Sequence, residues 1–112
     1  MKGEKKLIID TNDYRGSRVI FTFEKWQEKS IQHPELGNNT FIENLKKTIE
    51  NPSEVWQDNS DKEHKVCYYK KYSAIAYVKV VIWITSNPCE VVTAYEIDRI
   101  KETKYPQLKQ LK

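Results

Sequence analysis

The chain has 112 residues, which is long enough for one domain with a buried core and too short for two. Its hydrophobic fraction of 38% and charged fraction of 31% are those of an ordinary soluble protein, and its longest apolar stretch, residues 80–84, is far too short to cross a membrane. The net charge of +3 is too small to indicate a partner, so the distribution of the charges must carry that information.

The first segment, residues 1–17, is predicted to be a charged and loosely packed lead-in with one short apolar run, Leu7-Ile8-Ile9. This run is shorter than the apolar part of a secretory signal peptide. We therefore expect the chain as given to be cytoplasmic, unless another protein or an N-terminal fusion exports it.

Residues 18–97 are predicted to form a single domain that begins with a strand and a helix. Residues 18–23 alternate apolar side chains in the manner of a strand. Residues 24–32 contain no glycine or proline and predict a short helix, which ends at His33 because the residue before a proline is disfavoured in the helical region.

A second helix is predicted to begin at Thr40, with Thr40 and Glu43 forming a capping box. Asn51 and Pro52 close it. Its apolar stripe is predicted to bury one face, formed by Phe41, Ile42, Leu45 and Ile49.

From residue 53 the hydrophobic period changes from that of a helix to that of a strand. We expect strands at residues 53–57, 65–71, 77–85 and 90–95, joined by short turns. This order predicts an antiparallel meander whose aliphatic face is covered by the capped helix, and hence an α+β fold. Residues 98–112 are predicted to be a C-terminal tail that makes one helical turn and then frays.

The region between His64 and Cys89 contains lysines and aromatic residues but no aspartate or glutamate. Such a stretch suits a phosphate backbone with stackable bases. The alternative, an ordinary solvated sheet face with lysine stems lying over tyrosines, carries equal weight before any motif is considered. The residues concerned are Lys65, Lys70, Lys71 and Lys79, with Tyr68, Tyr69, Tyr72, Tyr77 and Trp83.

Four residues offer the groups needed to cleave RNA without a metal. Thr93 and Tyr95 lie two apart in a strand and share a face, to which Lys79 of the preceding strand also projects. His33 can move protons near neutral pH if the chain folds it over the sheet. Lysine and threonine can stabilise phosphoryl oxygens, and a tyrosine can stack on a base.

Each of these residues also has a simpler interpretation. A histidine before a proline is more often a hydrogen-bonded loop residue, and a strand threonine is often only a good β-former. Tyr95 could belong to the core or to a sheet edge. Lys79 lies in the most apolar strand and must reach solvent, a ligand or an acid, with Glu90 and Glu96 as the nearest candidates.

The two cysteines, Cys67 and Cys89, are predicted to be buried free thiols, with a disulfide as the alternative if their strands are neighbours. His64 and Cys67 have the spacing of half a zinc site, but the chain offers no second half-site. We therefore expect no metal site and no cofactor. His64 is expected to be a surface residue.

Several segments follow one another in a characteristic order. They are His-Pro-Glu-Leu at 33–36, Thr-Phe-Ile-Glu at 40–43, Ile-Glu-Asn-Pro at 49–52 with Val55, Val-Cys-Tyr-Tyr-Lys at 66–70, Tyr-Val-Lys-Val-Val at 77–81 and Val-Val-Thr-Ala-Tyr at 91–95. Their order and character resemble the phage-type members of the barnase–EndoU–colicin–RelE (BECR) superfamily of ribonucleases, and the resemblance covers approximately residues 18–97.

The resemblance implies N-terminal helices packed on a four-stranded antiparallel sheet and a metal-independent, RNA-cleaving site on that sheet. In such enzymes the ribose 2′-hydroxyl attacks the adjacent phosphate and leaves a 2′,3′-cyclic phosphate. His33 matches the histidine that acts as general acid or base, and Thr93 and Tyr95 match the pair that binds phosphate and base. Lys79 lies where a strand-borne cation is expected. Further RNA-binding candidates are Tyr69, Lys70, Lys71, Trp83 and Thr85.

The implied substrate is tRNA or mRNA, and an inhibitor protein is the implied partner of a toxin-like nuclease. No second histidine or arginine accompanies the set, so a slow, narrowly specific or inactive enzyme is also consistent with the pattern. A non-catalytic RNA-binding module and a protein-interaction domain of a phage or mobile element are the other functions that the sequence allows.

Overall fold

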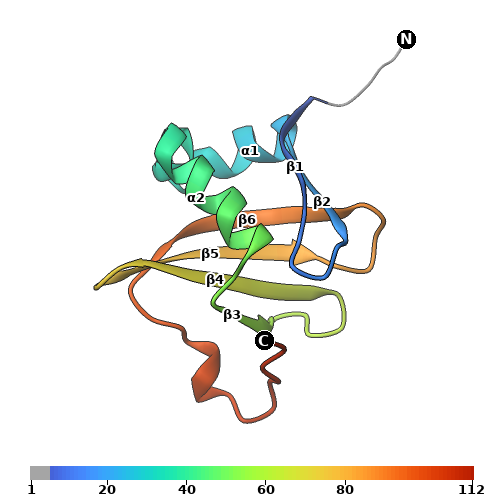
Figure 1. Cartoon of the computed structure of the whole chain (residues 1–112), viewed down its shortest axis with the longest axis vertical. Helices are drawn as coiled ribbons and strands as arrows, with labels where there is room; N and C mark the ends of the chain where they lie inside the picture. Colours follow the sequence, from blue (N-terminus) through green and yellow to red (C-terminus); the bar gives the residue numbers. More distant parts are fainter. Residues whose placement is uncertain (1–5) are drawn as a thin grey trace.

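The computed structural model describes residues 6–112 and shows one six-stranded mixed sheet with two α-helices (Figure 1). The strand order across the sheet is β1-β2-β6-β5-β4-β3. The strands are β1 (Leu7–Asn12), β2 (Arg18–Thr22), β3 (Glu54–Gln57), β4 (Lys65–Ser73), β5 (Ala76–Trp83) and β6 (Cys89–Ile97). The helices are α1 (Phe23–Ser30), α2 (Asn39–Glu50) and two short 3-10 helices, η1 (Pro34–Gly37) and η2 (Glu102–Lys104).

The α+β class is correct, but the expected four-stranded antiparallel sheet is too small. Strands β3 to β6 form the predicted antiparallel meander. The sheet then continues through β2, which runs parallel to β6 with Val19 opposite Cys89, and ends in β1. The hairpin of β1 and β2 thus covers part of an edge of β6 that would otherwise present unpaired backbone groups.

The expected lead-in is structured where the structure describes it, and its residues 1–5 lie outside the described part. Residues Leu7–Asn12 form β1, and the side chain of Ile9 is buried. The turn to β2 contains Gly16, whose φ of +88° lies in the left-handed region that favours glycine. The short apolar run did not predict this strand, because β1 is held by its pairing with β2, which the run by itself does not indicate.

Both helices begin with side-chain caps. The Thr22 hydroxyl accepts a hydrogen bond from the backbone N–H of Lys25 at the start of α1. The cap of α2 is Asn38, whose side chain accepts from the N–H of Phe41 at 3.1 Å, so the expected cap at Thr40 is wrong by two residues. Asparagine caps a helix at least as well as threonine, and the earlier start adds helical residues. Neither α-helix of the described chain is long and apolar enough to span a membrane.

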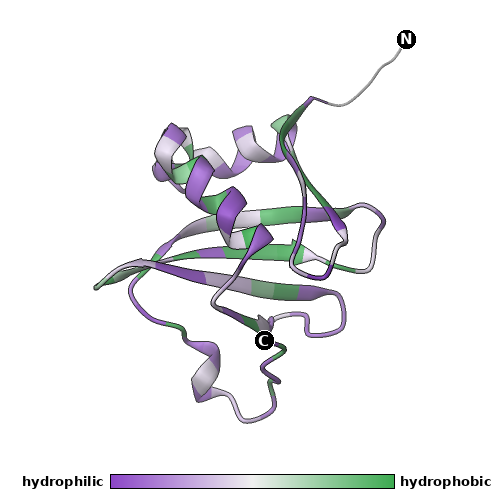
Figure 2. Ribbon diagram, in the orientation of Figure 1, coloured by the Kyte–Doolittle hydropathy of each residue, from purple (hydrophilic) through white to green (hydrophobic). Residues whose placement is uncertain are grey.

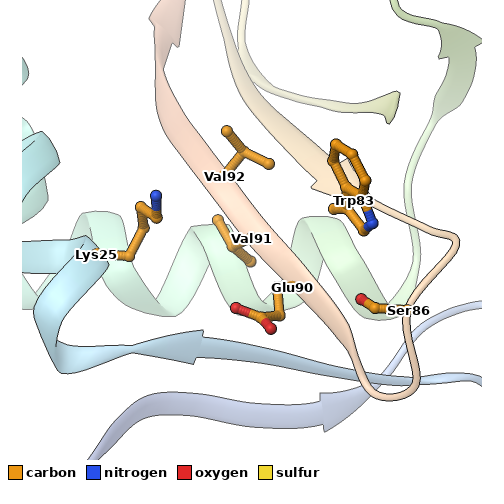
Figure 3. A pocket seen from close by; sticks show the side chains of 6 residues that line it. All are labelled: Lys25, Trp83, Ser86, Glu90, Val91 and Val92. Carbon is orange, nitrogen blue, oxygen red and sulfur yellow. The ribbon is translucent and has the colours of Figure 1, made fainter. Parts of the chain in front are cut away.

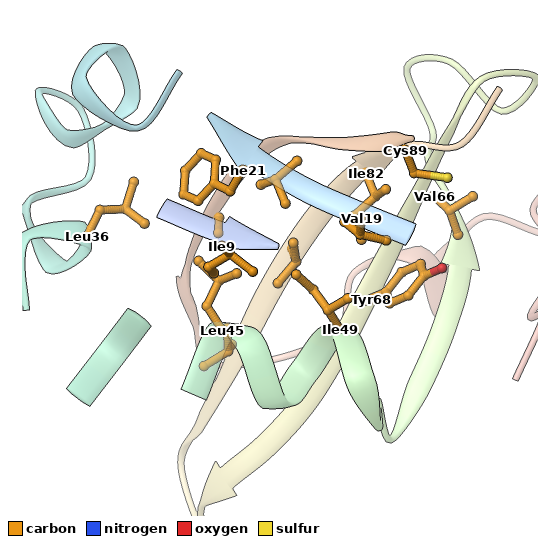
Figure 4. Packing of buried hydrophobic residues seen from close by; sticks show 14 of the residues in the cluster. Ile9, Val19, Phe21, Leu36, Leu45, Ile49, Val66, Tyr68, Ile82 and Cys89 are labelled. Carbon is orange, nitrogen blue, oxygen red and sulfur yellow. The ribbon is translucent and has the colours of Figure 1, made fainter. Parts of the chain in front are cut away.

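The main core lies between α2 and one face of the sheet (Figure 4). The predicted stripe of α2 is confirmed, because Phe41, Leu45 and Ile49 are buried and Ile42 packs against the same cluster. In Figure 2 the middle of β5 is hydrophobic, whereas α2 changes between hydrophobic and hydrophilic from turn to turn. The core members from the sheet include Val19, Phe21, Val66, Tyr68, Val78, Val80, Ile82 and Val91.

The C-terminal residues 98–112 pack on the molecule, contrary to the expected fraying. The backbone of Leu111 bonds to Val55, and Gln110 forms an isolated bridge with Trp56, so this segment lies beside β3 (Figure 1). The side chains of Glu102 and Leu108 are buried. Together with a second, smaller cluster around Cys67, Tyr69 and Val81, this segment shields part of the sheet face opposite α2.

Candidate active site

The sheet face opposite the main core carries three of the four predicted catalytic residues. Lys79 on β5 pairs in register with Tyr95 on β6, and Val81 pairs with Thr93. The register shifts between Val81 and Ile82, so that Val92 is an extra residue in β6. This irregularity lets Val91 point into the core while Thr93 and Tyr95 share the opposite face with Lys79.

His33 meets this group from the segment between α1 and η1. Its imidazole stacks on the Tyr95 ring with 4.5 Å between the ring centroids and an angle of 13° between the planes. Two hydrogen bonds hold the segment: the N–H of His33 donates to the carbonyl of Lys29, and the Glu35 carboxylate accepts the N–H of Glu96 at 3.1 Å. The histidine therefore lies against the sheet face, close to residues that are about 60 positions later in the chain.

Lys79 is paired with an acid that the sequence did not indicate. Its Nζ lies 3.3 Å from Glu102 Oε2, and neither Glu90 nor Glu96 is its partner. The two side chains are only 12% and 5% exposed, so the C-terminal segment both covers the lysine and compensates its charge. The ammonium also lies 5.7 Å from the centre of the Tyr95 ring.

Burial lowers the pKa of Lys79, but the surrounding Cys67, Tyr95 and Glu102 outweigh this effect and leave the pKa raised. Lys79 is therefore a cation at neutral pH. It can stabilise negative charge next to Tyr95, although one of its N–H donors already serves Glu102.

Thr93 has an unused hydrogen-bonding group. Its Oγ1 is buried, and among the residues that the structure describes it has no hydrogen-bond partner. A buried hydroxyl without a partner is unfavourable, and such groups often serve a ligand or a water molecule. A ligand oxygen could use this hydroxyl once the atoms that cover it shift.

Two of the predicted RNA-binding residues do not belong to an open site. Tyr69 is fully buried, and its hydroxyl donates to Glu102, so its ring cannot stack on a base. Lys70 points away from the site, with its Nζ bonded to the carbonyl of Asn51 at 3.0 Å. Composition alone could not separate the buried residues of the region between His64 and Cys89 from its exposed residues.

The other three candidates are accessible. Lys71 lies at the far end of the same face, with its Nζ 5.9 Å from the centre of the Tyr77 ring. Trp83 is half-buried and stacks on His64, with 4.8 Å between ring centroids. Thr85 is exposed after the end of β5. His64, expected only to be a surface residue, thus has a defined place against Trp83 and also contacts Asp61 at 2.9 Å.

Cys67 and Cys89 are buried and free, as predicted. Cys67 joins Asp58 and Glu102 in a group whose possible metal-binding atoms lie within 4.8 Å of one another. Burial raises the pKa of the Cys67 thiol strongly, which keeps it protonated, and Lys79 already occupies Glu102. This group therefore fits a buried hydrogen-bond network better than a cation.

The groups gathered around Tyr95 suit proton transfer and charge stabilisation on a phosphodiester, which is the chemistry of a nuclease. A family profile described as phage-Barnase-EndoU-ColicinE5/D-RelE like nuclease2 matches residues 2–111. The chain belongs to this family of phage-type BECR nucleases, which confirms the resemblance inferred from the segments. Searches of curated proteins and of solved structures gave no match.

Proposed function

We propose that this nuclease is a metal-independent endoribonuclease whose reaction takes place at the stacked pair of His33 and Tyr95. The stack is the observation that supports the proposal most directly, because it brings the imidazole of His33 next to a strand that also carries Thr93. An imidazole held against an aromatic ring has a restricted orientation, which favours proton transfer at a fixed position.

In the proposed reaction, His33 accepts the proton of the ribose 2′-hydroxyl. The 2′-oxygen forms a bond to phosphorus while the bond from phosphorus to the 5′-oxygen breaks, leaving a 2′,3′-cyclic phosphate. The imidazolium formed in the first half then protonates the departing 5′-oxygen, which becomes a hydroxyl. The ring of Tyr95 supports both His33 and a neighbouring base.

Lys79 and Thr93 would stabilise the negative charge that grows on the phosphoryl oxygens. The Lys79 ammonium lies near the Tyr95 ring but is already paired with the Glu102 carboxylate. It would therefore bind the phosphoryl oxygens through its remaining N–H groups. The Thr93 hydroxyl can donate to one of these oxygens, since it has no hydrogen-bond partner among the residues that the structure describes. Neither role requires a metal ion or a cofactor.

The test is cleavage of an end-labelled single-stranded RNA by the purified protein in EDTA. We expect products with 2′,3′-cyclic phosphate ends, and we expect His33→Ala to lower the rate by roughly 10²–10⁴-fold, the usual contribution of a general acid–base group. Gln32→Ala is the matched control, since Gln32 is exposed in the same segment. Undiminished cleavage by a folded His33→Ala protein would remove the proposed acid–base residue.

A non-catalytic RNA-binding module is the second candidate, and one observation favours it. The charge of Lys79 is compensated by Glu102, and no second histidine lies within the stack around Tyr95. A binding module would show salt-dependent affinity for RNA without cleavage, and Tyr95→Ala would weaken that affinity.

A toxin-like role with tRNA or mRNA as substrate, and with a protein inhibitor as partner, is a narrower form of the first proposal. It predicts that expression of the wild-type chain arrests growth of the host cells and that His33→Ala relieves the arrest. Measuring cell growth and sequencing the 5′-hydroxyl ends of cellular RNA after brief expression would separate tRNA from mRNA targets.

A further inference from the structure

A pocket lies on the same sheet face as the stacked pair of His33 and Tyr95, towards the other end of β5 (Figure 3). It has a volume of about 270 Å³ and is lined by Lys25, Trp83, Ser86, Glu90, Val91 and Val92. Trp83 is four residues beyond Lys79 in β5, which corresponds to about 13 Å along a strand. One single-stranded oligonucleotide could therefore contact both sites.

Trp83 lies between the His64 ring and the pocket. His64 precedes β4, and its ring stacks on the indole at an interplanar angle of 9°. The pocket lies towards β6, the other neighbour of β5, because Glu90 and Val92 line it. A flat aromatic ligand in the pocket would extend the stack of His64 and Trp83 by one ring.

The polar groups of the pocket are complementary to a nucleotide. The half-buried Glu90 carboxylate has no hydrogen bond or ion pair to any residue that the structure describes. It can only accept hydrogen bonds, so it selects donors. Lys25, whose one ion pair within the described chain is a 3.6 Å contact with Glu28, supplies a cation for a phosphate.

We propose that this pocket is a nucleobase subsite that selects a base with an exocyclic amino group. Trp83 stacks on the base, Glu90 accepts its amino hydrogens, and Lys25 binds an adjacent phosphate. Uracil is disfavoured because its ring N–H lies between two carbonyl oxygens, which face the carboxylate. As a specificity site for RNA cleavage the pocket rests on the proposed function, but base binding itself can be tested without cleavage.

The experiment uses the full chain and short 2′-O-methyl oligonucleotides of A, C or U, which lack the 2′-hydroxyl needed for cleavage. Fluorescence anisotropy measures the dissociation constants at low salt. We expect the A and C oligomers to bind roughly tenfold more tightly than the U oligomer, the discrimination typical of one good base-edge contact. Trp83→Leu should weaken all of them by roughly tenfold or more, as expected for loss of one stacked base.

Glu90→Gln tests the proposal even if Trp83→Leu fails to fold, because glutamine has the same size as glutamate. The amide of glutamine can donate as well as accept hydrogen bonds, so the weaker binding of the U oligomer should disappear. Glu96→Gln is the matched control, since Glu96 is exposed on the same strand outside the pocket and should leave the preference unchanged. Lys25→Ala, compared with Lys29→Ala on the same helix, should lower the salt dependence of binding.

Equal binding of the three oligomers, or a preference that Glu90→Gln does not change, would overturn the subsite even if the protein cleaves RNA. Selective binding that depends on Glu90, in a protein that never cleaves RNA, would support the subsite and reject the nuclease mechanism. The two proposals thus fail on different measurements.

Discussion

Tyr95 is the side chain around which the candidate active site is arranged. It contacts His33 by stacking and lies within 5.7 Å of the Lys79 ammonium, so it links the proposed acid–base group to the proposed cation. Its ring, more than its hydroxyl, provides these contacts.

This geometry predicts different outcomes for two substitutions of Tyr95. Tyr95→Phe keeps the ring and should retain most of the RNA-cleaving activity, whereas Tyr95→Leu removes the support of His33 and should lower kcat by about 10²-fold, the typical effect of a misplaced catalytic group. Single-turnover cleavage at saturating protein measures the step directly. Equal loss in both variants would instead assign the function to the phenol hydroxyl.

Glu102 is the second side chain on which the site depends, because its carboxylate is the buried ion-pair partner of the Lys79 ammonium. Glu102→Gln should free one positive charge for RNA and increase the slope of log affinity against log salt by about 0.7, the value for one additional phosphate contact with a single strand. It should also lower the free energy of unfolding by about 3 kcal/mol, because Lys79 loses its buried partner. Affinity measured at several salt concentrations tests the first effect, and urea unfolding tests the second. An unchanged salt slope would mean that Lys79 does not reach the bound RNA.

Among the elements, the turn between β1 and β2 is tied to the sheet through one buried carboxylate. Asp13 accepts hydrogen bonds from the backbone N–H groups of Arg15 and Ser17, each at 2.9 Å. It also accepts from the Arg15 side chain and from the Tyr68 hydroxyl of β4, at 2.9 and 2.6 Å. The N-terminal hairpin is thereby attached to a strand that lies three places away in the sheet.

We therefore expect Asp13→Asn to destabilise the protein by about 2–4 kcal/mol, because it leaves buried donors without a charged acceptor. Asp10→Asn is the control from the same hairpin. Asp10 pairs with Arg18 at the exposed surface and should contribute little to stability. Urea denaturation of the two variants and the wild type gives the comparison, and similar stabilities for Asp13→Asn and Asp10→Asn would contradict the role of the turn.

For the whole molecule, buried and paired acids determine how stability depends on pH. Burial raises the pKa of Asp13, but hydrogen bonds from Tyr68, Ser17 and Arg15 outweigh it, so the pKa is lowered in the folded state. A lowered pKa means that the stabilisation is complete above the unfolded-state value near 4 and is lost as the pH falls through the folded-state value. Asp58 has a lowered pKa as well, through hydrogen bonds that outweigh its burial.

Alkaline pH acts through the opposite shift. Burial, followed by a hydrogen bond to Asp13, raises the pKa of Tyr68, and burial is also the largest cause of the raised pKa of Tyr69. A raised pKa means that the stabilisation is complete below the unfolded-state value near 10 and is lost as the pH rises from there through the folded-state value. We expect a flat urea midpoint between about pH 5 and pH 8, with a decrease on either side, because the raised pKa of the buried Cys67 thiol begins to cost stability near its unfolded-state value of about 8.5. If the urea midpoint of Asp13→Asn falls with decreasing pH as steeply as that of the wild type, then other carboxyl groups control the loss of stability in acid.

Local sequence patterns predicted a large part of the secondary structure and of the candidate active site. The period of the side chains predicts the four strands of the meander, the apolar stripe of α2 and the common face of Thr93 and Tyr95, because periodicity depends only on near neighbours in the chain. That Lys79 shares this face, as expected, depends also on the register between β5 and β6. The two free cysteines and the nuclease family followed from composition and from the order of segments.

The remaining features depend on residues that are far apart in the sequence. The parallel pairing of β2 with β6, the burial of Glu102 against Lys79, and the stack of His64 on Trp83 each join side chains whose spacing carries no signal. Only the packing of the whole chain decides which partner neutralises a buried charge and which aromatic ring stays open to a ligand. The sequence by itself determined which residue types line the sheet, and the tertiary structure decided which of them remain accessible to a ligand.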